Sequence, residues 1–215
     1  MFLFNVTMQN HGGYTSYIPE DEDSIEVTNF EADDQLENYL TLIKKTDNAV
    51  KDLIAHFQEE EEPTMIIFFG DHQPKLADEI LEPFMGDAGS AADAVDGSSR
   101  YTNVSSRYEV PFFIWTNYDT EEQKDINISA NYLASYVLEN AGIPLTAYDD
   151  FLLEMRESYP VLTAKEYWDA EGNVMSWDEE TPSAIASYEN IQYNCLFDKE
   201  NKLRSFFNGS GTEEK

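Results

Sequence analysis

Two polar turns carry the residue types that could do chemistry in this chain. Asp71 and His72 follow the apolar run 64–69, and His11 precedes a pair of glycines. Neighbouring residues on a strand point to opposite faces, but just past a strand end both side chains can converge on one cation. A carboxylate oxygen and an imidazole nitrogen suit Mn²⁺ or Zn²⁺ better than a calcium cage. The pair therefore predicts a metal site, to which His11 adds either a ligand or a hydrogen bond to a bound oxyanion.

Simpler interpretations stand beside this one. An Asp-His pair in a turn more often serves only capping and surface hydrogen bonds, and acid-rich surfaces more often confer solubility than bind calcium. His56 lies late in a predicted helix, where an imidazolium would favour the negative end of the helix dipole. Cys195 has no thiolate-activating neighbours in sequence and is predicted to be a buried apolar side chain.

Composition excludes several classes of function. The 215 residues include 13 basic and 43 acidic side chains, a formal net charge of −30. Nucleic-acid binding depends mostly on Lys and Arg, so no nucleic-acid partner is expected, and an anionic membrane would repel the chain as a whole. Hydrophobic residues make up 41%, which is too many for a disordered acidic tail. One cysteine excludes an internal disulfide framework and a cysteine-based zinc cluster.

Three apolar runs predict the strands that position the two turns. Residues 2–6 and 110–115 are short and rich in strand formers, and residues 64–69 are continuously apolar. A continuous run is typical of a central parallel strand covered on both faces. Strands alternating with helices over residues 1–160 indicate an α/β layered core with a mainly parallel sheet. Three strands are few for such a sheet, so further strands are expected upstream.

The sequence predicts three helices, and apolar residues at helical spacing indicate the first of them. Asp33 or Asp34 offers an N-cap for the first helix, and Ser129 offers one for the second. Gly142 stops the second helix. The first helix runs to about residue 58, the second to about residue 140, and the third covers residues 149–158.

The region 161–215 has a different pattern and predicts a small antiparallel appendage. Tyr167 and Trp168 are separated from residues 174–177 by a glycine-containing turn, which indicates a hairpin. Residues 193–197 and 203–207 flank a polar stretch and predict a second hairpin. The expected organisation is a catalytic half-domain over residues 1–160 with these hairpins appended to it.

Four motifs in order resemble the lipoteichoic-acid-synthase-like proteins of the sulfatase family, within the alkaline phosphatase superfamily. Residues 4–14, ending His-Gly-Gly-Tyr, resemble their strand-and-turn motif, and residues 39–54 resemble the helix that follows it. Residues 66–74, which contain Gly-Asp-His-Gln-Pro, are similar to the family's metal-binding turn. Residues 108–114 are similar to the next core strand.

The resemblance implies a manganese-dependent phosphoglycerol transferase on the extracellular face of a bacterial membrane, tethered by N-terminal helices. By position, Asp71 and His72 would be metal ligands, with Mn²⁺ expected and Zn²⁺ or Mg²⁺ as alternatives. His11 would contact the phosphate or glycerol group of a glycerol-phosphate lipid or polymer. In this family a threonine attacks the lipid-linked glycerol phosphate, and the metal neutralises charge on the phosphoryl oxygens.

The chain departs from the family pattern at the nucleophile. The family's threonine and acidic metal ligand lie upstream of the strand that matches residues 2–6. Four threonines were considered and none has a matching context: Thr7, Thr15, Thr28 and Thr41. The chain is therefore expected to be the C-terminal half of a catalytic domain: a soluble fragment, inactive alone and binding metal weakly.

Two further expectations follow. If upstream strands are absent, the apolar strand 2–6 or 64–69 loses a neighbour, so a homodimer through the exposed sheet edge is expected. The alternative to an enzyme fragment is a non-catalytic acidic cell-surface module that binds cations or cell-wall polymer.

Overall fold

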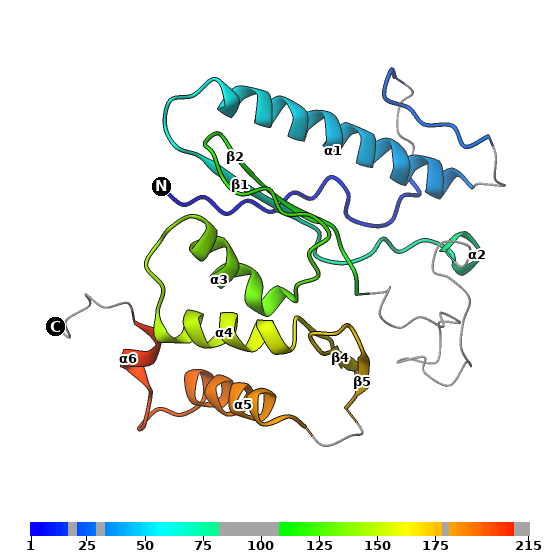
Figure 1. Cartoon of the computed structure of the whole chain (residues 1–215). Coiled ribbons are helices and arrows are strands. Elements are labelled where there is room, and N and C mark those ends of the chain that lie inside the picture. Colours follow the sequence, from blue (N-terminus) through cyan, green and yellow to red (C-terminus); the bar gives the residue numbers. More distant parts are fainter. Residues whose placement is uncertain (17–20, 29–32, 82–107, 178–180, 209–215) are drawn as a thin grey trace. The chain divides into compact units, whose positions relative to one another are not determined.

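A computed structural model describes residues 1–16, 21–28, 33–81, 108–177 and 181–208 (Figure 1). Contacts within the chain divide it into two units, Met1–Asp119 and Thr120–Lys215. Each unit is described by itself below.

Helix α1, Asp34–Gln58, is the longest element of the first unit. Its predicted N-cap is confirmed at Asp33, whose carboxylate accepts a hydrogen bond from the Leu36 backbone N–H at 2.9 Å. The capping interaction satisfies one of the backbone donors that every helix start leaves unpaired. His56 lies in the last turn, as expected, with Nε2 3.9 Å from the Glu60 carboxylate.

Strands β1, Met65–Phe69, and β2, Phe112–Thr116, form a two-stranded sheet in the first unit. Both were predicted, but they pair antiparallel, whereas a mainly parallel sheet was expected. The Phe68 and Phe113 rings stack across the pair, with centroids 5.4 Å apart. A continuous apolar run is typical of a strand covered on both faces, but it does not indicate the direction of the neighbouring strand. The antiparallel pairing of β1 and β2 could therefore not be predicted from the sequence.

The predicted strand over residues 2–6 is not formed. Residues 1–8 have no regular secondary structure, and their large apolar side chains are exposed, Phe2 and Phe4 among them. Strand propensity needs a neighbouring ladder to become a strand, and among the described residues this segment has none.

The buried core of the first unit is a small cluster of four side chains: Tyr14, Leu36, Leu76 and Ile80. Ile80 belongs to the short helix α2, Asp78–Leu81. The cluster joins α1 to two segments distant from it in sequence, and each of these segments follows one of the polar turns with candidate chemistry.

Three helices of the second unit enclose a cluster of buried side chains in which two of the four are tyrosines. They are α3, Ala130–Asn140, α4, Ala147–Ser158, and α5, Ser183–Leu196. Tyr132 of α3 is 0% exposed and packs with side chains of α4 and α5. Its hydroxyl donates a hydrogen bond to the Tyr159 carbonyl at 2.9 Å, so the buried ring is also satisfied at its polar end.

Side-chain hydrogen bonds lie at the starts of α4 and α3, but only at α4 do they cap the helix. Thr146 and Asp149 form a capping box at the start of α4, each accepting from the other's backbone N–H. Burial by itself would raise the pKa of Asp149, but hydrogen bonds from Thr146 and Ser135 outweigh it and hold that pKa below its ordinary value. Ser129 flanks α3 as predicted, although its hydroxyl bonds to the Leu162 backbone instead of capping the helix.

A three-stranded antiparallel sheet completes the second unit: β3, Val161–Leu162, β4, Glu166–Trp168, and β5, Val174–Ser176. The β4–β5 pair confirms the first predicted hairpin.

The second predicted hairpin is wrong. Residues 193–196 end helix α5, and α6, Arg204–Phe207, is a short helix. Ile185 and Tyr188 are buried three residues apart, which is a helical spacing that the aromatic residues further along obscured. Cys195 was predicted to be buried and is exposed. It therefore contributes no buried packing.

Candidate metal and substrate site

The Asp71-His72 turn follows directly from the end of β1. The Gly70 N–H donates to the Pro111 carbonyl at 3.0 Å, which extends the β1–β2 pairing by one residue. A Cβ at position 70 would lie 3.1 Å from the Cβ of Val110, closer than side chains normally approach. Glycine is therefore needed here for close packing of the two strands, and that packing sets where the turn begins.

His72 is oriented by the backbone of the next residue. Its Nδ1 lies 2.8 Å from the Gln73 carbonyl oxygen, which can only accept, so Nδ1 carries the proton in this arrangement. The other nitrogen, Nε2, is left with its lone pair free and lies 3.8 Å from Oδ2 of Asp71. This arrangement, a ring N–H held by a carbonyl, is common for histidines that bind metals.

The donor pair fits one divalent cation. Two ligand atoms on a tetrahedral zinc-sized ion lie about 3.4 Å apart, given metal–ligand distances of roughly 2.1 Å. The separation of 3.8 Å between Asp71 and His72 is within reach of that value. Within the described residues no group of three or more His, Cys, Asp or Glu side chains could hold a metal. Asp71 and His72 thus supply two ligands, fewer than the three or four of a complete site.

Side chains of α1 hold the His11 turn. Asn38 donates to the Tyr14 carbonyl at 2.8 Å, and the Thr46 hydroxyl donates to the Asn10 side-chain oxygen at 3.1 Å. Tyr14 closes the turn by donating from its hydroxyl to the Asn10 carbonyl at 2.8 Å. Asn38 and Thr46 are eight residues apart on one helix, so they lie on the same face and fasten the two ends of the turn.

The turn encloses a small pocket of about 210 Å³. Gly13 adopts a φ of +115°, a conformation that other residues resist, and lets the chain fold back around the pocket. His11 was predicted to lie at a substrate site, whereas the hydroxyl groups of Thr15 and Ser16 were not; their adjacency to the double glycine was the available signal. The pocket is lined by His11, Gly12, Gly13, Tyr14, Thr15, Ser16 and Leu42.

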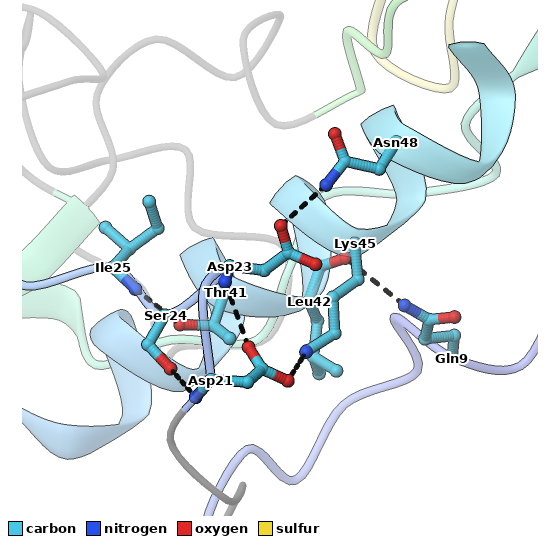
Figure 2. Close-up of polar contacts among 9 residues, drawn as sticks. All are labelled: Gln9, Asp21, Asp23, Ser24, Ile25, Thr41, Leu42, Lys45 and Asn48. Carbon is cyan, nitrogen blue, oxygen red and sulfur yellow. Dashed lines mark hydrogen bonds and ion pairs between the residues drawn. The ribbon is translucent and has the colours of Figure 1, made fainter. Parts of the chain in front are cut away.

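Helix α1 also holds the segment 21–25, which follows the His11 turn in sequence (Figure 2). Three α1 side chains, one of them a lysine, make these contacts from positions three or four residues apart. They are the ion pair of Lys45 with Asp21, the 2.6 Å hydrogen bond from Asn48 to Asp23, and the 3.0 Å hydrogen bond from the Ile25 N–H to the buried Thr41 hydroxyl. Helix α1 thus holds both the His11 turn and the segment 21–25 through hydrogen bonds and an ion pair.

Core packing brings the two polar turns into one region. Tyr14, which follows His11, packs in the same buried cluster as Leu76 and Ile80, which follow His72. Burial raises the pKa of the Tyr14 hydroxyl, and the negative charges of Tyr39 and then Asp71 raise it further. The Asp71 charge therefore acts directly on the residue that closes the His11 turn. This region therefore contains one carboxylate and two histidines, groups that are suited to binding a phosphate ester beside a cation.

No helix among the described ranges combines the length and the apolar character that crossing a bilayer demands.

Two similar proteins give this arrangement a context. The chain is 28% identical over 212 residues to a Rhizobium meliloti (strain 1021) protein provisionally named a cyclic beta-1,2-glucan modification protein. It covers 32% of that protein, so the chain spans about a third of the relative's length.

The solved structure of the Streptococcus pyogenes phosphoglycerol transferase GacH, in complex with sn-glycerol-1-phosphate, has the same fold, with a TM-score of 0.60 and 21% identity. The match covers 95% of this chain and 47% of GacH. Residues 1–143 match the family model described as Sulfatase. The layered, alkaline-phosphatase-like α/β fold and the family resemblance are thereby confirmed, and the chain belongs to the sulfatase family.

Proposed function

We propose that this chain forms part of a metal-dependent site that transfers or hydrolyses a phosphoglycerol group. The observation that carries the proposal is the buried contact of Tyr14, which follows the His11 turn, with Leu76 and Ile80, which follow the Asp71-His72 turn, in a chain of the sulfatase family. The likeness to a phosphoglycerol transferase that binds sn-glycerol-1-phosphate supports a glycerol-phosphate lipid or polymer as the donor. The glucan named for the Rhizobium relative supports a carbohydrate acceptor.

Asp71 and His72 would hold Mn²⁺, or else Zn²⁺ or Mg²⁺. When bound, the cation supplies neutralisation of charge on the phosphoryl oxygens. The Gln73 carbonyl keeps His72 in the tautomer whose Nε2 is a lone-pair donor. Asp71 adds the negative charge that favours a divalent cation over a neutral ligand.

His11 would bind the substrate from the opposite turn. Protonated or as a neutral donor, its ring gives a hydrogen bond to a phosphate oxygen. The Thr15 and Ser16 hydroxyls offer neutral donors and acceptors that suit the hydroxyls of a glycerol group.

We place the nucleophilic threonine and the acidic metal ligand on a segment outside these 215 residues. The lack of a threonine in the family's sequence context among Thr7, Thr15, Thr28 and Thr41 supports that placement. On this proposal, the chain alone binds Mn²⁺ weakly and turns over no phosphodiester. The whole protein would act on the extracellular face of the membrane, tethered by helices elsewhere in its sequence, and this chain alone would pair into a homodimer through an exposed strand edge.

Calorimetric titration with Mn²⁺ tests the metal assignment. A background of about 150 mM salt suppresses binding by the diffuse acidic surface. We expect weak binding to the unaltered chain and its loss in Asp71→Ala with His72→Ala. The matched control is His56→Ala, which removes another exposed histidine beside a carboxylate and should leave binding unchanged. Binding that survives the double substitution would contradict the assignment and would favour a non-catalytic acidic module.

An activity assay tests the division of the site. A chromogenic phosphodiester is offered to this chain and to a longer chain that includes the expected threonine. We expect metal-dependent turnover only in the longer chain, since loss of a nucleophile typically costs several orders of magnitude. Equal activity in both would place the nucleophile within these residues. His11→Ala in the active form should raise KM more than it lowers kcat.

A further inference from the structure

The end of helix α5 and the turn after it present a group of exposed apolar side chains, which we call the α5–α6 patch. Tyr193, Leu196, Phe197 and Leu203 are 64%, 69%, 65% and 48% exposed. The Tyr193 and Phe197 rings contact each other, with centroids 5.5 Å apart. Large apolar side chains exposed together, unlike single ones, mark a surface that binds something.

The patch has a defined backbone. Asn194 accepts a hydrogen bond from the Leu203 N–H at 2.9 Å and donates one to the Asn201 carbonyl at 2.9 Å, which ties the turn back onto α5. The Asp198 carboxylate accepts from the backbone N–H groups of Glu200 and Asn201 and so fixes the turn from inside.

Two aromatic residues of α6 anchor the far side of the patch. The Phe207 ring lies 5.1 Å from the ring of Tyr148 on α4, and the Phe206 ring lies 6.3 Å from that of Phe151. Phe206 and Phe207 are half-buried, whereas Leu203 one turn earlier faces solvent. The exposed side chains are therefore carried by an anchored element.

Three cations border the patch. Lys199, Lys202 and Arg204 are exposed, and none forms an ion pair with any residue that the structure describes. Residues 193–207 contain two acidic side chains beside these three, so this stretch has a net charge of +1 in a chain of −30. The positive groups lie in sequence next to the exposed apolar residues of the patch, with Asp198 and Glu200 on either side of Lys199.

We propose that the α5–α6 patch binds the lipid–water interface of a membrane with anionic headgroups. Exposed Leu, Phe and Tyr side chains bordered by unpaired Lys and Arg are the combination that interfacial segments use, the first entering the acyl boundary and the second reaching the phosphates. The negative charge elsewhere opposes binding little, because salt screens it beyond about 8 Å.

Pairing of the patch with a second copy of itself is disfavoured by the same charges. A two-fold contact places the same surface on both sides, so Lys199, Lys202 and Arg204 of one copy would face those of the other. An anionic interface has no such conflict. The proposal rests on the second unit alone and is independent of the metal and phosphoglycerol assignments.

Vesicle co-sedimentation of the full chain tests the proposal. Vesicles of phosphatidylcholine with about 30% phosphatidylserine carry a surface charge comparable to that of an anionic cytoplasmic leaflet, and neither lipid has a phosphoglycerol headgroup. We expect binding that falls about tenfold or more in Leu196→Ser with Phe197→Ser, because the apolar contact is lost. Lys199→Glu with Lys202→Glu should reduce binding to these vesicles by about tenfold but leave binding to pure phosphatidylcholine nearly unchanged.

Matched controls distinguish an effect of the patch from the effect of removing any exposed apolar residue or reversing any exposed charge. Val174→Ser removes an exposed apolar residue of β5, and Lys165→Glu reverses an exposed lysine, both in the same unit. Both should bind as the unaltered chain does, and circular dichroism should show all variants folded. Absence of binding, or equal binding by patch and control variants, would overturn the proposal. A concentration-dependent dimer abolished by the patch substitutions would also overturn it, by showing a protein interface.

Discussion

The two units position their residues by different means. In the first unit the His11 turn and the segment 21–25 are tied to α1 by polar side chains, over a core of four buried side chains. In the second unit three helices meet around the fully buried Tyr132, and capping side chains complete the packing. Candidate chemistry thus lies in the unit whose loops are held by hydrogen bonds, while the other unit is stabilised mainly by buried aromatic rings.

This difference matters because removing the two kinds of contact lowers the free energy of unfolding by different amounts. Removing a buried ring leaves a cavity and costs several kcal/mol, whereas removing one partly exposed hydrogen bond costs about 1 kcal/mol. The first unit should therefore tolerate substitutions that loosen its turns without unfolding, and the second should not. Substitutions in each unit test this contrast.

The largest effect is expected at Tyr132. Tyr132→Ala removes a ring that is 0% exposed and should lower the free energy of unfolding of the second unit by about 3–5 kcal/mol. Chemical denaturation, followed by amide exchange in each unit, measures it. Tyr132→Phe keeps the ring and loses the hydrogen bond to the Tyr159 carbonyl, so the free energy of unfolding should fall by about 1–2 kcal/mol. A small effect of the alanine variant would show that the aromatic core is not the main support.

Gly70 should give the next largest effect. Gly70→Val places a branched side chain where even a Cβ would lie 3.1 Å from Val110, and should cost about 1–3 kcal/mol. Because the turn begins at Gly70, Mn²⁺ binding should weaken as well. Gly12→Ala is the control for stability, since its Cβ would meet nothing closer than the Tyr14 hydroxyl at 4.0 Å. Equal stability of both variants would mean that β1 and β2 can separate freely.

Loosening of the His11 turn should be smaller and local. Asn38→Ala removes the 2.8 Å hydrogen bond to the Tyr14 carbonyl at a cost of about 1 kcal/mol, so amide exchange over residues 10–16 should accelerate about fivefold. Mass spectrometry resolves this segment. Lys44→Ala, which breaks an exposed pair with Asp47, should change exchange there hardly at all. If both variants exchange alike, the hydrogen bond from α1 does not hold the His11 turn in place.

The smallest expected effect is a change in the pH dependence of stability, which should be seen only at alkaline pH. Burial raises the pKa of Tyr148 to about 12, with the charge of Tyr188 adding to it. The folded state thus favours the neutral phenol, and its contribution to stability is complete below pH 10 and is lost as the pH rises towards 12. Tyr148→Phe should reduce the loss of stability between about pH 10 and 12, measured by denaturation. An unchanged pH profile would assign the alkaline loss to other groups.

Local pattern accounted for much of the fold. Residues 34–58 carry both a capping aspartate and an apolar stripe, so the α1 helix could be predicted nearly to the residue. The β4–β5 hairpin followed from its glycine turn in the same way. The His11 and Asp71-His72 motifs could also be identified from the sequence, because their residue types and their order along the chain are enough to identify them. The assignment of residues 1–160 to a catalytic half and 161–215 to an appendage stays a prediction.

Residue types and their spacing were therefore enough to predict helix α1 with its cap, the candidate metal ligands and the class of chemistry they suit. Tertiary structure decided which way β1 and β2 run, that residues 2–6 form no strand, and that α5 is a helix. It also decided that Tyr14 packs with Leu76 and Ile80, which joins the two polar turns. The reason is physical: caps and periodicity act within a few residues, whereas strand direction and the meeting of distant turns depend on partners that only the folded chain supplies.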